Sequence, residues 1–302
     1  MVEEVVRGLI TDENGIYVDA TAGGGGHSAA LLEMLGPTAT VLGIDRDADS
    51  ISQVSERLSA DARFHIYHGN FSELDKFLTQ YGCDKIRGIL YDLGVSSRQI
   101  DSPIRGFSYR LDGPLDMRMD NALPMDAAQF VGSASQDEIA SVLRNYGEER
   151  NAFSIAKALV NKRLSYPIET TGDLRKIIES TQPKMLNKTL ARVFQAIRIT
   201  INDELHQLSI ALDTALPRLD SGGRIATIAY HSLEDRIIKK KMADLIRNCN
   251  CPPQLPLCVC DGLAKFVKVE NGRFFPSEQE IAQNSRARSA ILRIYEKRGS
   301  KI

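Results

Sequence analysis

A run of four glycines is the feature of this sequence whose spacing points most directly to chemistry. Gly23–Gly26 follow a short apolar stretch that ends in Asp19, and a helical pattern begins immediately after them. Glycines at such a turn let the backbone approach a ligand closely, and the N–H groups at the start of the helix then face that ligand. The spacing Gly24-x-Gly26-x-x-Ala29 also fits the dinucleotide fingerprint, although that match alone is weak. A plain tight turn is the alternative that needs no ligand.

Acidic residues at the ends of apolar runs narrow the choice of ligand. Asp19 disfavours a pyrophosphate next to the glycines but suits a ligand with an ammonium or sulfonium group, and S-adenosylmethionine carries both. Asp45 ends the next apolar run, about twenty residues past the loop, where an acid hydrogen-bonds ribose hydroxyls in either nucleotide class. A strand-end cap is the alternative for Asp45. Phe71 follows a third run, where an aromatic ring packs beside an adenine or, equally, joins the core.

The elements that must position these residues alternate along the chain. Strands are expected at Tyr17–Asp19, Val41–Asp45, Phe64–Asn70, Ile86–Asp92, Arg224–Tyr230, Phe266–Val269 and Ala290–Tyr295. Helices are expected within residues 1–16, over Ile51–Leu58, over Leu205–Leu216 with a stop at Pro217, and over Leu233–Leu245, with a turn at Ser221–Gly223. This alternation predicts an α/β fold with an open parallel sheet, whose carboxyl edge carries the ligand.

The alternation stops near residue 100, where a loop with interleaved arginines and aromatics begins. Arg105, Phe107, Tyr109 and Arg118 lie in this loop, residues 101–122, and could stack an unpaired base and hold phosphates. A self-paired surface loop is the alternative, because arginines and aspartates are about balanced there. Residues 124–202 then follow helical patterns. We therefore expect one domain from residues 1–102 and 203–302, and an inserted helical domain, residues 103–202, that contacts an RNA substrate.

The bulk charge of the chain restricts how it can bind RNA. The 302 residues carry a net charge of −1, with a pI near 6.5, so the chain lacks the global basic field of a non-specific nucleic-acid binder. Any RNA site must therefore be local. Lys239, Lys240 and Lys241 cluster on an expected helix and are candidates for RNA contact, although a solvated face is the usual role of a charge run.

Five cysteines bear on redox state and metal binding. Cys83 is isolated, and Cys249, Cys251, Cys258 and Cys260 lie within twelve residues, which does not suggest a distributed disulfide framework. Four thiolates could bind zinc, but the Cys-x-Cys spacing is tighter than usual, so reduced thiols and no metal are expected. No apolar run approaches the roughly 18 residues of a membrane span, and no signal peptide is evident, so a cytoplasmic protein is expected.

Eight segments carry a resemblance to a known family. They are Asp19–Ser28, Asp92–Ser97, Arg105–Ser108, Asp112–Asp120, Tyr146–Arg150, Phe194–Ile199, His231–Arg236 and Ser285–Ser289. With them the chain resembles, nearly end to end, the RsmH (MraW) family, methyltransferases that act on N4 of a cytidine in 16S ribosomal RNA. The glycine loop is shared with many nucleotide enzymes, whereas Gly113–Asp120 and His231–Arg236 are highly specific.

The resemblance implies a fold, a reaction and a set of contacts. It implies a Rossmann-like class I methyltransferase sheet with an inserted helical domain, S-adenosylmethionine as cofactor, and 16S rRNA in the decoding region of the small ribosomal subunit as substrate. The implied cofactor contacts are Gly25, Gly26, His27, Asp45, Phe71, Asp92 and Gln99. The chain departs from the family pattern in starting inside the first expected helix, without the usual preceding stretch, and in having Ala22 where Phe is common.

The chemistry of the acceptor suggests a catalytic pair. A cytosine amine has its lone pair delocalised into the ring and becomes nucleophilic only if acceptors hold its hydrogens. We expect Asp92, with His231 or Ser232 from the end of the fifth strand, to lie near this amine; helix capping is the alternative for His231. Competing functions are an NAD-dependent oxidoreductase and a non-catalytic RNA-binding assembly factor. No membrane partner is expected, and the sequence leaves a homodimer open.

Overall fold

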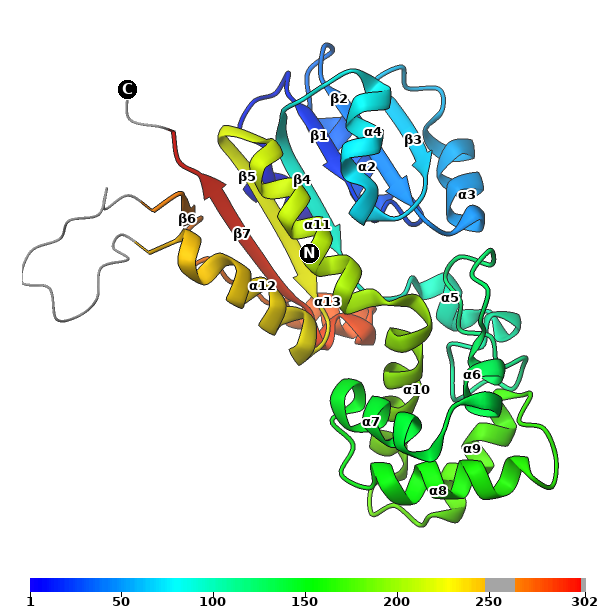
Figure 1. Cartoon of the computed structure of the whole chain (residues 1–302). Helices are drawn as coiled ribbons and strands as arrows, with labels where there is room; N and C mark the ends of the chain where they lie inside the picture. The colour runs from blue at the N-terminus through cyan, green and yellow to red at the C-terminus, as the bar shows by residue number, and fades with distance from the viewer. Residues whose placement is uncertain (248–263, 300–302) are drawn as a thin grey trace, which may run out of the picture. The chain divides into compact units, whose positions relative to one another are not determined.

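A seven-stranded sheet organises the unit that contains the glycine turn (Figure 1). The computed structural model describes residues 1–247 and 264–299. The strands are β1 Ile16–Asp19, β2 Thr40–Asp45, β3 Phe64–His68, β4 Ile86–Asp92, β5 Leu219–Ala229, β6 Phe266–Lys268 and β7 Ile291–Lys297, in the order β3-β2-β1-β4-β5-β7-β6. β7 is antiparallel to β5 and β6, and the other neighbours pair in parallel. The predicted α/β fold with a Rossmann-like sheet is confirmed.

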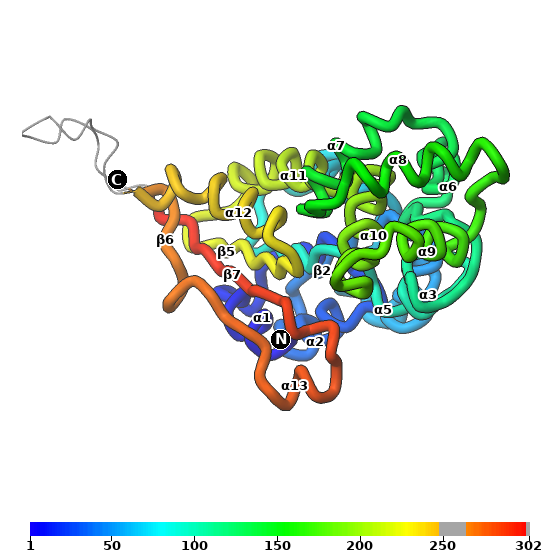
Figure 2. Tube along the Cα trace, turned by 90° about the horizontal axis from the view of Figure 1, so that it is seen from below, coloured from blue at the N-terminus to red at the C-terminus, as the bar shows by residue number. Residues whose placement is uncertain are grey.

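Helices cover both faces of this sheet, as Figure 2 shows. One face packs against α4 Leu74–Tyr81, α11 Glu204–Arg218 and α12 Ser232–Leu245, and the other against α1 Val2–Leu9, α2 Gly26–Met34 and α3 Ala48–Leu58. Successive strand residues point to opposite faces, so Tyr17 joins one core cluster and Val18 the other. A short helix, α13 Glu278–Gln283, precedes β7. Because both of their faces are buried, the inner strands β1 and β2 are apolar along most of their length.

Two local predictions near residue 220 were wrong. Helix α11 does not stop before Pro217 but ends at Arg218, and the turn expected at Ser221–Gly223 lies inside β5. The Lys297 ammonium donates to the carbonyls of Pro217 and Leu219, which satisfies acceptors at the helix end. Gly222 takes a left-handed φ of 77°, and the pairing of β4 with β5 shifts register there. The glycines that suggested a turn therefore lie in a bulge of β5.

A second, helical unit spans Val95–Glu204, and the first comprises Met1–Gly94 with Leu205–Ile302. The second unit contains α5 Ser97–Asp101, α6 Ala127–Ser133, α7 Gln136–Gly147, α8 Ala152–Arg163, α9 Thr171–Ser180 and α10 Leu186–Asn202, with a hydrophobic cluster of its own. The unit begins at Val95 rather than at residue 103, because Val95 packs against that cluster. The predicted helical character of residues 124–202 is confirmed.

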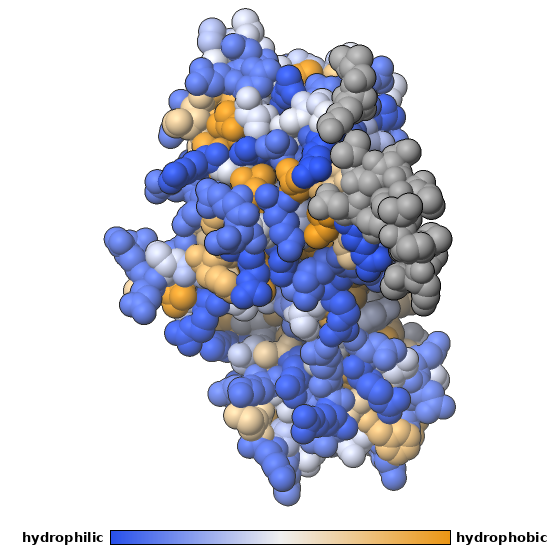
Figure 3. Space-filling view, turned by 90° about the vertical axis from the view of Figure 1, so that its left-hand side faces the viewer, coloured by the Kyte–Doolittle hydropathy of each residue, from blue (hydrophilic) through white to orange (hydrophobic). Residues whose placement is uncertain are grey.

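The surface is largely hydrophilic on the face that Figure 3 shows, with apolar residues in small scattered groups. Scattered apolar side chains are normal on a folded protein. No helix in residues 1–247 and 264–299 combines the length and the apolar character needed to cross a bilayer.

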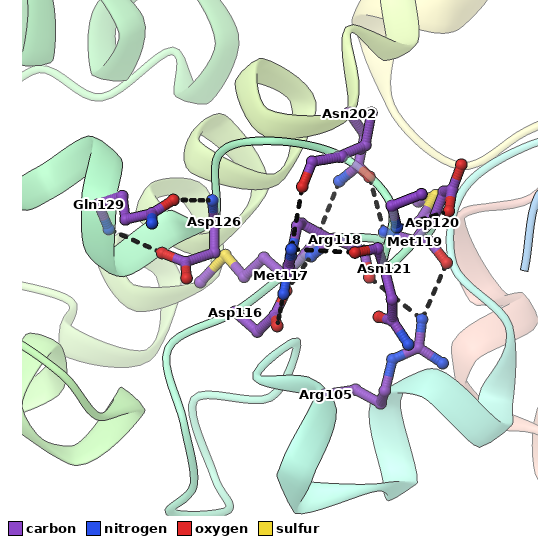
Figure 4. A network of polar contacts seen from close by, with 12 residues as sticks. Arg105, Asp116, Met117, Arg118, Met119, Asp120, Asn121, Asp126, Gln129 and Asn202 are labelled. Atoms are coloured by element: carbon purple, nitrogen blue, oxygen red, sulfur yellow. Dashed lines mark hydrogen bonds and ion pairs between the residues drawn. The ribbon is translucent and has the colours of Figure 1, made fainter.

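A polar network fixes the long loop before α6 (Figure 4). Buried Asn202, at the end of α10, accepts from the Met119 N–H at 2.8 Å and donates to the Met117 carbonyl at 2.7 Å. Met117 has a left-handed φ of 63°, which is uncommon for a residue with a long side chain. Its N–H also donates to the Arg105 carbonyl. The network therefore holds a backbone conformation that the sequence alone disfavours.

Replacing Asn202 by Ala should lower the free energy of unfolding of the second unit by about 2–4 kcal/mol. The change removes the acceptor of one backbone N–H and a donor to one backbone carbonyl, and such buried losses cost about 1–3 kcal/mol each. Denaturant unfolding measures the effect. Asn121→Ala, at an exposed position of the same loop, should change stability by less than about 0.5 kcal/mol. Equal losses in the two variants would contradict this role of Asn202.

Candidate functional site

The predicted aspartates meet at one edge of the sheet, because β1, β2 and β4 are parallel and each ends in one of them. Asp19 is completely buried, and its carboxylate accepts from the Ser28 hydroxyl at 2.7 Å and from the Thr21 N–H at 3.3 Å. Burial raises the pKa of Asp19, against the opposing effect of the nearby His27. The carboxyl edge of the sheet therefore brings together three carboxyl groups, those of Asp19, Asp45 and Asp92.

The glycine turn joins this edge to the start of α2. Gly25 caps the helix with a φ of 75°, and a Cβ there would lie 2.6 Å from a Val54 methyl group, so both conformation and space require glycine. A Cβ on Gly26 would meet nothing within 4 Å. The turn therefore combines close packing on its inner side with open space at the first helical residue, where backbone N–H groups lack helical partners.

Asp45 is held by the backbone on both of its oxygens. Its Oδ2 accepts from the Gly23 N–H at 2.7 Å, and its Oδ1 accepts from the Asp47 N–H at 2.8 Å. Burial raises the pKa of Asp45, although these two backbone donors act in the opposite direction. A carboxylate has about four acceptor positions, so two remain for the hydroxyls of a ribose. The position of Asp45 also fits the alternative of a strand-end cap, because its carboxylate accepts a hydrogen bond from the N–H of Asp47, two residues further along the chain.

Asp92 is at the centre of a cluster of polar side chains. The Tyr230 hydroxyl donates to its Oδ1 at 3.0 Å, the His27 Nε2 lies 3.6 Å from its Oδ2, and its own N–H donates to the Thr21 hydroxyl at 2.8 Å. Burial would lower the pKa of His27, but Asp92 and then Asp19 raise it, and the net pKa is raised. Burial and the adjacent carboxylate raise the pKa of Tyr230, which keeps its hydroxyl a donor.

His231 lies next to this cluster in sequence but has a different partner. It is the N-cap of α12: its Nδ1 accepts from the Glu234 N–H at 3.4 Å, and its Nε2 lies 3.2 Å from the Glu234 Oε1. Glu234 in turn accepts from the Tyr230 N–H. The structure thus favours the helix-capping alternative for His231, and a catalytic role for it stays a prediction.

Phe71 and Gln99, the other two expected cofactor contacts, are in different units. Phe71 is half-buried, packs edge-on against Tyr91 with ring centroids 5.7 Å apart, and contributes to one core cluster. Gln99 is in the second unit, where its Oε1 accepts from the Ser96 N–H in a capping box. Core packing of Phe71 is thus observed, and cofactor contact by either residue stays a prediction.

The arginines of the predicted RNA loop are bound within their own unit (Figure 4). Arg105 is buried and donates to the carbonyls of Arg118 and Met119, and Arg118 forms a two-pronged ion pair with Asp116. Phe107 is buried in the core of this unit. These contacts favour the self-paired alternative. RNA binding by Arg105, Phe107 and Arg118 stays a prediction.

Tyr109 and the three lysines of α12 are the remaining residues predicted to bind RNA. Half-buried Tyr109 packs edge-on against Phe194. Lys239 pairs with Asp235 at 3.1 Å, Lys241 contacts the Asp213 carboxylate, and Lys240 is exposed. The pairing of two of the three lysines fits a solvated face, and RNA binding by this helix stays a prediction.

The four clustered cysteines, Cys249, Cys251, Cys258 and Cys260, lie outside the described residues. The structure therefore does not test whether they bind zinc. Within residues 1–247 and 264–299, no group of three or more His, Cys, Asp or Glu side chains is arranged to hold a metal ion.

Sequence reasoning missed Tyr230, Ser28 and Thr21 as members of the site. Tyr230 was expected only as the end of a strand, and Thr21 and Ser28 only as members of the Asp19–Ser28 segment. Tyr230 directly follows β5, Thr21 follows β1, and Ser28 lies in the first turn of α2. These positions were the available signal, because residues just beyond the carboxyl edge of parallel strands face the ligand crevice.

Asp92→Asn should lower the pKa of His27, because the carboxylate that raises it against burial is removed. The raised pKa belongs to the folded chain, so protonated His27 adds stability below about pH 6.5, and this is lost as the pH rises through the folded pKa. The stability difference between wild type and the variant should therefore shrink as the pH rises. NMR titration of His27 and unfolding at several pH values measure both effects.

Asp12→Asn is the matched control for that titration. Asp12 pairs with Arg87 and precedes β1, away from its carboxyl end. The pKa of His27 should not change in this variant. An equal shift in both variants, or none in Asp92→Asn, would contradict the proposed interaction.

The chain is similar in sequence to known proteins. The ribosomal RNA small subunit methyltransferase H of Fusobacterium nucleatum subsp. nucleatum is 42% identical over 296 residues, covering 97% of this chain and 94% of the relative. The protein of the same name from Burkholderia vietnamiensis is 45% identical over 303 residues, covering 98% and 96%. A solved structure of a putative methyltransferase from Streptococcus mutans in complex with SAH is 14% identical, with a TM-score of 0.45, and covers 98% of this chain and 94% of that one. A family model described as the MraW methylase family matches residues 1–298, and the chain belongs to this family.

Proposed function

We propose that this chain transfers a methyl group from S-adenosylmethionine to N4 of a cytidine in the decoding region of 16S rRNA, within the small ribosomal subunit in the cytoplasm. Membership of a methylase family supports the reaction, and relatives named ribosomal RNA small subunit methyltransferase H support the substrate class. Membership of this family also argues against an NAD-dependent oxidoreductase, for which the only support was the spacing of the glycines. One observation supports the proposed acceptor of the amine hydrogens: the Tyr230 hydroxyl donates a hydrogen bond to the Asp92 carboxylate, at the carboxyl edge of the sheet beside the glycine turn.

The residues at this edge fit S-adenosylmethionine, which supplies an electrophilic methyl group on a sulfonium. The turn is open at Gly26, and the two free acceptor positions of Asp45 suit ribose hydroxyls. The buried His27 Nδ1 has no hydrogen-bond partner among the described residues, so it is available to a polar group of a ligand. Asp19 adds a buried carboxylate close to this turn, which favours a cationic ligand over a pyrophosphate.

Asp92 is the proposed acceptor for the amine hydrogens of the target base. Its Oδ1 already accepts from Tyr230, which fixes the plane of the carboxylate, and its Oδ2 faces His27. An acceptor fixed in this way can hold an N–H while the nitrogen lone pair turns toward the methyl group, so most of the rate enhancement comes from positioning. The base must leave its stack to enter such a site.

The second unit is proposed to contact the RNA, although most of its loop arginines are self-paired. Half-buried Tyr109 is the part of the loop best placed to meet a base, because the exposed Arg110 guanidinium lies over its ring at 5.8 Å. A homodimer stays a prediction, which sedimentation velocity would test.

Substitutions of Asp92 and Asp45 should have different effects: the first should mainly lower the turnover rate, and the second should mainly weaken cofactor binding. Asp92→Asn should lower kcat by at least about 100-fold, because the amine loses the charged acceptor proposed for it, and it should change the Kd of S-adenosylmethionine much less. Asp45→Ala should raise that Kd about tenfold, the effect of losing a charge-assisted hydrogen bond. Steady-state kinetics and calorimetry measure the two constants. Wild-type turnover by Asp92→Asn would remove its proposed role.

The reaction itself is tested with labelled S-adenosylmethionine and small subunits from a strain that lacks this methyltransferase. We expect label in 16S rRNA and N4-methylcytidine after digestion to nucleosides, with large subunits as the control substrate. Binding to the subunits without transfer of label would instead identify a non-catalytic assembly factor. Label on another atom or base would reject the cytidine N4 assignment while keeping the methyltransferase.

A further inference from the structure

An exposed aromatic ring stacked on an arginine lies in the segment between β6 and α13. The Arg273 guanidinium lies 4.5 Å from the centroid of the Phe275 ring, and 54% of Phe275 is exposed. The neighbouring Phe274 exchanges backbone hydrogen bonds with Leu292 of β7, at 2.9 and 3.0 Å. The backbone next to Phe275 is therefore fixed to the sheet, although the ring itself is open to solvent.

The strand register puts this ring at the same edge of the sheet as the candidate active site. β7 is antiparallel, so it begins at the carboxyl edge: its first residue, Ile291, pairs with Ala229, the last residue of β5. Tyr230 follows Ala229 directly. Neighbouring strands lie about 4.8 Å apart, so the edge position of Phe274, on the far side of β7, is about 10 Å from the end of β5.

The charge of this segment is positive. Between residues 271 and 289 it contains three arginines and two glutamates: Arg273, Arg286, Arg288, Glu278 and Glu280. Glu280 pairs with the amino group of Met1, so its charge is compensated within the unit. Arg286 and Arg288 are exposed on the short turn that leads into β7. In a chain with a net charge of −1, this segment carries a small local excess of positive charge, and its exposed arginines can reach a phosphate.

We propose that residues 273–288 form an RNA-binding surface of the first unit, named here the β7 platform. Phe275, backed by Arg273, stacks on an unpaired base that flanks the target cytidine, and Arg288 contacts a backbone phosphate. An aromatic ring backed by a guanidinium is a sequence-tolerant stacking surface for single-stranded nucleic acid. The inference rests on the proposed function, which supplies an RNA whose target base has left its stack.

The platform is tested by separating RNA affinity from cofactor affinity. Phe275→Ala should raise the KM for small subunits about tenfold and weaken direct binding equally, with kcat and the Kd of S-adenosylmethionine unchanged. Phe275→Trp keeps a stacking ring and should stay within about twofold of wild type. Arg288→Ala should raise the same KM about threefold, and its effect should diminish at higher salt because a phosphate contact is screened.

Matched controls lie elsewhere in the same unit. Met34→Ala removes an exposed apolar side chain at the last residue of α2, and Lys265→Ala removes an exposed cation just before β6, at the opposite edge. Neither should change the KM for subunits. A wild-type KM and wild-type binding in Phe275→Ala would overturn the platform, as would equal losses in the Met34 control.

The failure of the platform and the failure of the proposed function give different results. If the wild-type chain transfers no methyl group to subunits, the proposed function fails, and direct binding alone decides the platform. Weaker subunit binding by Phe275→Ala than by Phe275→Trp would then still support it, and equal binding would overturn it.

Discussion

Buried negative charge at one edge of a parallel sheet is the constraint on which the rest of this structure depends. Asp19 and Asp45 are both buried enough for their pKa values to rise, and an unpaired buried carboxylate is costly. The glycine turn supplies part of the compensation, because the left-handed φ of 51° at Gly23 accompanies an N–H that donates to Asp45. Gly23 therefore stabilises the Asp45 carboxylate, and the open space at Gly26 suits the ligand proposed above.

The sequence predicted this edge because its signals are local. Each of the first four strands shows as an apolar run that ends in a polar residue, and parallel topology then brings these strand ends together. The sequence did not predict which side chains of the site form hydrogen bonds with one another. Tyr230 and Asp92 are 138 positions apart, and nothing in the pattern around either residue selects the other. Only the packing of β5 beside β4 brings that hydroxyl to that carboxylate.

The loop arginines show a different limit of sequence reasoning. Arginines interleaved with aromatics and aspartates are typical both of an RNA-binding loop and of a loop that pairs with itself. Burial distinguishes the two cases: Arg105 is only 8% exposed, with its guanidinium on two backbone carbonyls, while Arg110 is exposed over Tyr109. Composition cannot supply that distinction, because burial depends on where the chain folds back.

The reversed direction of β7 links the two proposed roles of the first unit. The Arg293 side chain of β7 binds Asp235 at 2.6 Å and so fixes the first turn of α12, where Glu234 accepts from the Tyr230 N–H. This strand thereby supports the residue that orients Asp92. If β7 were parallel to β5, the residues that lead into it would lie at the opposite edge, away from Tyr230. Because it is antiparallel, the segment that carries Phe275 is brought to the carboxyl edge, and the same strand supports both the acceptor and the proposed RNA contact.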